Sequence, residues 1–185
     1  NQCKHGYIVK VTNALRADED DYYLKFVGQN DKDGSGSWVE CAKPGIPRTL
    51  TNMPLIIQRT ATANEFIVKP FAYEDRRVGD ELTNPLPSFV QTSDGLPKSS
   101  NNEFVGRINK VLFFRNRLAF LSGENVILSR PGTIDKPDFF AETALTVSAS
   151  DPIDISAAST FPSELFDGID INTGLLVFST NQQFL

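Results

Sequence analysis

The sequence predicts an all-β, mainly antiparallel protein, and three observations lead to this fold class. Short runs alternate apolar and polar residues with a period of two, and turn-forming residues bound each run. No segment repeats its apolar residues at helical spacing. In residues 108–132, three apolar runs are separated by only one to three residues. Such short links allow only antiparallel neighbours.

The first part of the chain contains five predicted strands. Each combines β-branched and aromatic residues in an alternating pattern, as half-buried strands do. They cover residues 6–13, 21–28, 37–43, 54–60 and 65–71. We therefore expect a β-rich N-terminal domain over residues 1–75.

Residues 76–106 have a different character. They are rich in polar residues and proline and predict a long connecting loop, with residues 91–102 as its most mobile part. A connection of this length usually marks a domain boundary or a binding excursion. The acidic run of residues 18–21 predicts a solvated turn ahead of a strand.

The second half returns to strands at residues 108–115, 117–123 and 125–132. The short links between them predict a three-stranded antiparallel meander. Residues 111–114 are apolar at every position, which predicts burial on both faces of the sheet.

An internal repeat lies in this half of the chain. RLAFLSGENVIL (117–128) and GLLVFSTNQQFL (174–185) align with a shift of 57 positions. A strand, a short polar turn and a returning strand that recur in this way are typical of β-propeller blades. We therefore expect part of a β-propeller over residues 107–185. The alternative is that any two hairpins look alike.

Composition excludes several classes of function. The chain has 185 residues and a net charge of −5 without a basic cluster, so a grip on nucleic-acid phosphates is not indicated. Its single histidine, His5, weakens any Ser/His or Cys/His nucleophile scheme. Cys3 and Cys41 are compatible with one disulfide or with two thiols. With His5 they are too few for a zinc site of about four ligands.

Residues 29–40 have the spacing of a calcium-binding loop. Asp31, Asp33 and Glu40 occupy its positions 3, 5 and 12, but position 1 is the neutral Gln29. The flanking runs alternate like strands, and Asp33-Gly34 suits a hairpin connection. We therefore favour a hairpin and keep Asp31, Asp33 and Glu40 as candidate calcium ligands. No other cofactor is expected.

Carboxylate pairs raise the possibility of glycoside hydrolysis, which needs two carboxyl groups across a cleft. On a strand, Asp151 and Asp154 would point to opposite faces, and Asp151-Pro152 is better suited to starting a turn. For every pair we favour a turn or solvated surface. The pairs are Asp151 and Asp154, Glu74 and Asp75, and Asp80 and Glu81. Trp38, Tyr22 and Tyr23 could stack on a sugar, although core packing is the default for such aromatics.

Several blocks of the sequence together resemble a known family. They are DDYYLKF, SWVECAKPGI, NPLPSFV, FVGRINKVLFFRNRLAFLSGENVILSRPG, DFF, TALTVSASDPIDISAAS and GLLVFSTNQQFL, in this order. The chain resembles the tail tubular protein B, or tail nozzle protein, family of short-tailed podoviruses. The most specific blocks are FFRNRLAFLSGENVILSRPG and DPIDI. The residues QTSDGLPKSSNNE read as a surface insertion, and the chain's size is that of an internal fragment.

The resemblance implies a structural role. Members form a ring of six copies in the lower part of a tubular tail, below an adaptor ring (the upper tail tube) and near the tail fibres, and DNA leaves through the channel. The implied fold includes a β-propeller, and the implied location is the virion, with assembly in the host cytoplasm. We expect no enzymatic activity and no membrane span. The alternative is a tail protein that binds or degrades polysaccharide. We also expect the cut edges of the propeller to pack against a neighbouring copy.

Overall fold

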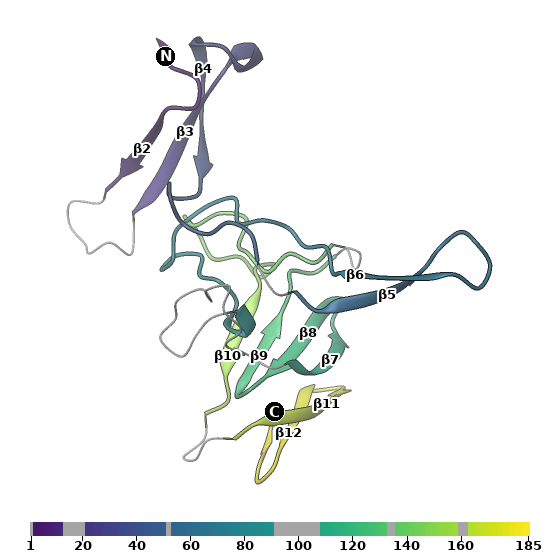
Figure 1. The fold of residues 1–185 in the computed structure, drawn as a ribbon. Helices are drawn as coiled ribbons and strands as arrows, with labels where there is room; N and C mark the ends of the chain where they lie inside the picture. Colours follow the sequence, from purple (N-terminus) through teal and green to yellow (C-terminus); the bar gives the residue numbers. More distant parts are fainter. Residues whose placement is uncertain (1, 13–20, 51–52, 91–107, 133–135, 159–162) are drawn as a thin grey trace.

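The structure is a computed structural model that describes residues 2–12, 21–50, 53–90, 108–132, 136–158 and 163–185. Within these ranges the chain forms strands β1 to β13 and two 3-10 helices, η2 and η3 (Ser88–Val90), with no α-helix. All neighbouring strands in its sheets run antiparallel. The predicted all-β, antiparallel fold class is confirmed (Figure 1).

The N-terminal sheet has the strand order β1-β4-β3-β2. Its strands are β1 (Gln2–Cys3), β2 (Ile8–Val11), β3 (Tyr22–Gly28) and β4 (Gly34–Cys41). Phe26 on β3 is completely buried and meets its cross-strand partner Trp38 edge to face, with ring centroids 5.3 Å apart. These alternating positions therefore serve core packing, as the sequence predicts.

The β3–β4 hairpin confirms the interpretation of residues 29–40, but its turn lies earlier than predicted. The chain reverses through η2 (Gln29–Asp31), where Asn30 and Asp31 have φ values of 53° and 58°. Asn and Asp tolerate this left-handed conformation because their short side chains can bond to the local backbone. Gly34, placed in the turn by the sequence, is already the first residue of β4.

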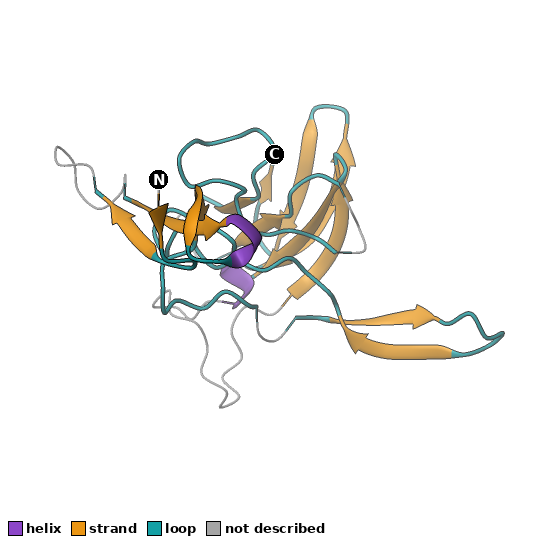
Figure 2. Cartoon of the chain, turned by 90° about the horizontal axis from the view of Figure 1, so that it is seen from above, coloured by secondary structure: helices purple, strands orange, loops and turns teal. Residues whose placement is uncertain are grey.

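A second hairpin projects away from the rest of the molecule. It consists of β5 (Leu55–Arg59) and β6 (Phe66–Pro70), which pair only with each other. Both views show it extending past the neighbouring sheets (Figures 1 and 2). Every residue of β6 is exposed, so this ribbon has no covered face within the described chain.

The central sheet has the order β10-β9-β8-β7 and confirms the predicted meander. Its strands are β7 (Ile108–Phe114), β8 (Arg117–Ser122), β9 (Asn125–Leu128) and β10 (Ile153–Ser156). The predicted burial of residues 111–114 on both faces is wrong, because Val111 and Phe113 are each 52% exposed. The face of β7 that carries Val111 and Phe113 is uncovered within the described chain, whereas the inner strand β8 is buried at every residue.

The two faces of β8 belong to two different apolar cores. Leu118 and Phe120 pack into the first core, and Ala119 and Leu121 into the second. The rest of the first core is Leu50, Met53, Leu86, Phe89, Val90, Ile127, Phe139 and Phe140. It therefore combines residues of the N-terminal part, of segment 76–106 and of the C-terminal part, while the predicted three-part division stays a prediction.

A third sheet, β11-β12-β13, repeats the geometry of β7-β8-β9. Its strands are β11 (Leu165–Ile171), β12 (Gly174–Ser179) and β13 (Gln183–Phe184). Ile108 pairs with Ser122 and Leu165 with Ser179, and in both ribbons a bulge follows that first pair. Every later pair of β7 with β8 has its counterpart in β11 with β12 after the shift of 57 positions that the sequence repeat predicts, and both pairs of β12 with β13 have one in β8 with β9.

The two repeats stack on each other. At Gly168 on β11, an added Cβ would lie 2.9 Å from a methyl carbon of Leu112 on β7 and 3.8 Å from one of Leu121 on β8. The close approach requires glycine at this position, because a side chain would fill the space that the leucines occupy. The Asp and Gly residues of β11 explain why the sequence pattern missed this strand.

Candidate functional site

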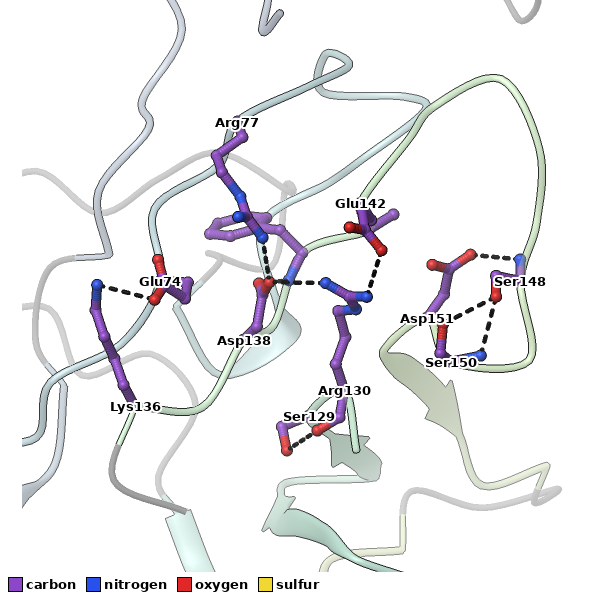
Figure 3. A network of polar contacts seen from close by, with 12 residues as sticks. Glu74, Arg77, Ser129, Arg130, Lys136, Asp138, Glu142, Ser148, Ser150 and Asp151 are labelled. Atoms are coloured by element: carbon purple, nitrogen blue, oxygen red, sulfur yellow. Dashed lines mark hydrogen bonds and ion pairs between the residues drawn. The ribbon is translucent and has the colours of Figure 1, made fainter. Parts of the chain in front are cut away.

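The most concentrated group of charged side chains lies on the loops beside the first core. Its centre is Asp138, which forms ion pairs with two arginines. Its Oδ2 lies 2.9 Å from Nη2 of Arg77 and 3.3 Å from Nη1 of Arg130. Arg130 also pairs with Glu142 at 2.7 Å, and Lys136 pairs with Glu74 at 3.0 Å. Figure 3 shows these side chains pointing toward one another from three different stretches of chain.

Local backbone bonds position this network. The amide of Arg130 donates to the carbonyl of Asp138 at 2.7 Å, and the amide of Phe140 donates to the Asp138 carboxylate at 2.9 Å. Because Asp138 is buried, its charge needs these donors and the two arginines to offset desolvation. The network surrounds a hollow of about 230 Å³. Its three cations and three carboxylates balance, so it can cross-link loops but offers no surplus charge to a ligand.

Arg117, at the start of β8, is a second organising residue. Its guanidinium donates to the carbonyls of Ser129 at 2.9 Å, Asp151 at 2.6 Å and Ala149 at 2.6 Å. Burial lowers the pKa of Arg117, while the negative charge of Asp151 acts in the opposite direction. The fork of the guanidinium holds the loop that precedes β10. The sequence analysis did not predict this role. The position of Arg117 inside the apolar run FFRNRLAFL could have indicated a buried arginine that needs hydrogen-bond acceptors.

The candidate calcium ligands do not come together. Asp31 and Asp33 lie in the β3–β4 turn, where Asp33 accepts the amide of His5 at 2.7 Å and Asp31 lies 4.0 Å from the His5 ring. Glu40 lies near the other end of β4, about 20 Å away at roughly 3.3 Å per residue. There it accepts hydrogen bonds from Thr143 and Ala144. Among the described residues, no three His, Cys, Asp or Glu side chains are grouped as metal ligands would be.

The carboxylates considered for hydrolysis have separate structural partners. Asp151 closes a turn with Ser148, whose amide donates to it at 2.7 Å, so the prediction that it starts a turn is wrong. Asp154 accepts the amide and hydroxyl of Ser88 at 2.6 and 2.7 Å. Of the acidic run 18–21, residues 18–20 lie outside the described residues. Asp21 is buried and pairs with Lys10, so this residue is not part of a solvated turn.

The two remaining pairs are also engaged. Asp80 caps a turn by accepting from the amides of Leu82 and Thr83 and from the Thr83 hydroxyl, each at 3.0 Å. Burial acts to raise the pKa of Asp80, but these hydrogen bonds outweigh it and lower the pKa. Glu81 pairs with Lys43 at 3.0 Å. Glu74 forms the ion pair with Lys136 described above. The structure gives no role to Asp75.

A groove of about 750 Å³ lies beside β11 and the β12–β13 turn. Phe166 and Phe178 line it together with polar side chains. Its one carboxylate is Asp167, which pairs with Lys110 at 2.9 Å. Among the described residues, the lining of the groove therefore offers no second carboxyl group of the kind that glycoside hydrolysis needs.

Cys3 and Cys41 are both free thiols. Cys3 lies opposite Gly34, at the start of β4, and Cys41 ends the same strand. Seven residue steps at roughly 3.3 Å place them about 23 Å apart, whereas a disulfide needs Cα atoms within about 7 Å. None of the helices in the described ranges is long and apolar enough to cross a membrane.

The fold consists of stacked antiparallel sheets, and charge-balanced networks connect its loops. Together these features are typical of a structural β-protein. The profile of the bacteriophage nozzle protein family matches residues 1–185, and the chain belongs to this family.

A comparison with known proteins agrees. Over 183 residues, 98% of this chain, it is 32% identical to "Tail tubular protein gp12" of Escherichia phage T7. The chain spans about one fifth of the length of that relative, since the match covers 20% of it.

Proposed function

We propose that the chain forms part of the wall of a ring of six copies at the lower end of the tail, around a channel through which phage DNA leaves. The ring adjoins the adaptor ring above it, the tail fibres attach near that junction, and assembly takes place in the host cytoplasm. Membership of the nozzle family over residues 1–185 is the observation that carries this proposal.

The repeated sheets support a β-propeller as the building principle. A propeller blade is a four-stranded antiparallel sheet, and neighbouring blades pack face to face around an axis. The meander β7 to β10 has this strand order, and the ribbon β11 to β13 stacks on it with the same register. We infer that both are blades and that their free edge strands pack against further strands of a neighbouring copy.

The charge of the chain suits a wall along which DNA slides. Each phosphate that a protein neutralises releases counterions and adds to the grip on DNA. A net charge of −5 and arginines already paired with carboxylates keep that grip weak.

Electron microscopy of the protein together with its adaptor tests the proposal. We expect a six-fold ring with an open axial channel and these sheets in its wall. A protein that remains monomeric beside its adaptor would contradict the ring. A filter-binding assay with duplex DNA at physiological salt should show no saturable binding, and tight binding would contradict a sliding surface.

A further inference from the structure

The β5–β6 hairpin carries an apolar face that nothing in the described chain covers. Residues directly opposite each other in an antiparallel pair share a face. The pairs Leu55 with Pro70, Ile57 with Val68 and Arg59 with Phe66 therefore lie on one side of the ribbon. Leu55, Ile57, Phe66 and Val68 form its apolar face, and they are 68%, 73%, 61% and 65% exposed.

The opposite face of the hairpin is mixed. It carries the cross-strand pairs Ile56 with Lys69 and Gln58 with Ile67, so each apolar side chain faces a polar one. The hairpin is thus amphipathic, a pattern that sheets adopt when one face is buried.

The hairpin needs a covering partner for its own stability. A two-stranded ribbon is at best marginally stable in water when no face is packed. Four large exposed side chains make a patch on the order of a few hundred Å², a size at which exposed apolar surface marks an interaction site. Edge-to-edge pairing is disfavoured, because Arg59, Lys69 and Pro70 lie on these short strands and such residues protect sheet edges. The face is therefore the surface to be covered.

Charge identifies the kind of partner. The hairpin has a net charge of +1, because it contains Arg59, Lys69 and Glu65. The whole chain has a net charge of −5, so the rest of the chain has a net charge of −6. Within the described chain, neither Arg59 nor Lys69 takes part in an ion pair. A basic hairpin on an otherwise acidic chain is complementary to the body of another copy of the same chain.

We propose that the apolar face of the β5–β6 hairpin docks on the body of a second copy of this chain and forms the contact between neighbours. The contact is heterologous: each copy gives one hairpin and receives one, as in a closed ring. A stable interface buries about 800 Å² per partner, and the apolar face of one hairpin supplies a few hundred Å² of that area at each junction. This inference rests on the proposed ring and names the surface that builds it.

Two matched double variants test the docking. Ile57→Thr with Val68→Thr removes one cross-strand pair from the apolar face. Gln58→Thr with Ile67→Thr alters the adjacent pair on the opposite face. Threonine keeps the strand propensity in all four positions. Circular dichroism and a melting curve establish that both variants fold.

The readout is the oligomeric state of the full chain, followed by sedimentation velocity over a wide range of concentration. We expect the apolar-face variant to raise the dissociation constant between copies by at least about tenfold. The opposite-face variant should change it by no more than about threefold. A benzophenone cross-linker at position 57 should yield covalently joined copies of the chain.

The outcomes separate the two proposals. A wild-type protein that stays monomeric at every concentration overturns both the ring and the hairpin contact. A wild-type protein that assembles, with both variants assembling equally well, overturns the hairpin contact alone. If the cross-linker at position 57 captures only a different tail protein, the covering partner is not a second copy and the inference is wrong.

Discussion

Glu40 accepts a 2.6 Å hydrogen bond from the hydroxyl of Thr143, which lies 103 residues further along the chain. Its second oxygen accepts the amide of Ala144 at 2.7 Å. One carboxylate at the end of β4 therefore ties the N-terminal sheet to a loop of the C-terminal half. The parallel bridge between Ala42 and Gly79 lies beside it in sequence and strengthens the same junction.

Replacing Glu40 by Ala should loosen this junction. Loss of two hydrogen bonds to a charged acceptor, with the Ala144 amide left partly buried, should lower the free energy of unfolding by about 2 kcal/mol in urea titrations. Asp31→Asn is the control, because its carboxylate is 84% exposed and asparagine tolerates the left-handed backbone at this position, and it should cost no more than about 0.5 kcal/mol. Equal costs for the two variants would show that the junction contributes nothing.

Arg117→Met should destabilise the protein more strongly. It leaves the carbonyls of Ser129, Ala149 and Asp151 without their buried donor, at a cost of about 3 kcal/mol. Hydrogen exchange should rise in the loop before β10, which these carbonyls hold. The control is Arg115→Met, since Arg115 is exposed and only stacks on Phe114. Unchanged exchange in the Arg117 variant would contradict the positioning role.

Arg76→Met should leave stability unchanged or raise it by about 1 kcal/mol. Arg76 is 1% exposed, and its guanidinium lies 5.3 Å from the Phe140 ring and has no hydrogen-bond partner among the residues that the structure describes. Burial lowers its pKa, and an apolar side chain of similar volume avoids that desolvation. Arg77→Met should instead lower the unfolding free energy slightly, because it breaks the ion pair with Asp138. A loss above about 2 kcal/mol at Arg76 would contradict this prediction.

The turn capped by Asp80 should give stability a dependence on acid pH. The pKa of Asp80 is lower in the folded protein, so its stabilisation is complete above the ordinary value near 3.8 and is lost as the pH falls through the folded value. Asp80→Asn should cost about 1 kcal/mol at neutral pH, and its difference from wild type should shrink below about pH 3.8. A difference that stays constant down to pH 2 would contradict it. Asp75→Asn, at a carboxylate to which the structure gives no role, is the control.

Gly168→Ala should disturb the stacking of the two repeats. The new methyl group would lie 2.9 Å from a methyl carbon of Leu112 and 3.3 Å from the carbonyl oxygen of Leu176, an overpacking that costs about 1–3 kcal/mol. Gly174→Ala is the matched control, because its methyl would lie at an ordinary 3.6 Å from Leu185. Thermal unfolding followed by calorimetry compares the two. Equal melting temperatures would mean that the sheets do not stack closely at Gly168.

The candidate site shows where local reasoning ends. The spacing of Asp31, Asp33 and Glu40 is a property of the chain alone, whereas ligation needs the three carboxylates to converge. Once residues 29–40 form a hairpin, a strand separates Glu40 from the turn, and Glu40 finds Thr143 instead. Arg117 and Asp138 could not be identified beforehand, because their partners are backbone groups and side chains brought close only by folding.

Alternation along the chain was enough to determine most of the antiparallel strands, the meander and the repeat with its shift of 57 positions, since hydrophobic periodicity and short links are local properties. Which face of each strand is covered was decided by the tertiary structure. Residues 111–114 are apolar throughout, yet Val111 and Phe113 are exposed because no other part of the described chain covers their face of β7. β8 is buried throughout because a core lies on each side of it. Burial depends on neighbours that are distant in sequence, and only the assembled sheets supply them.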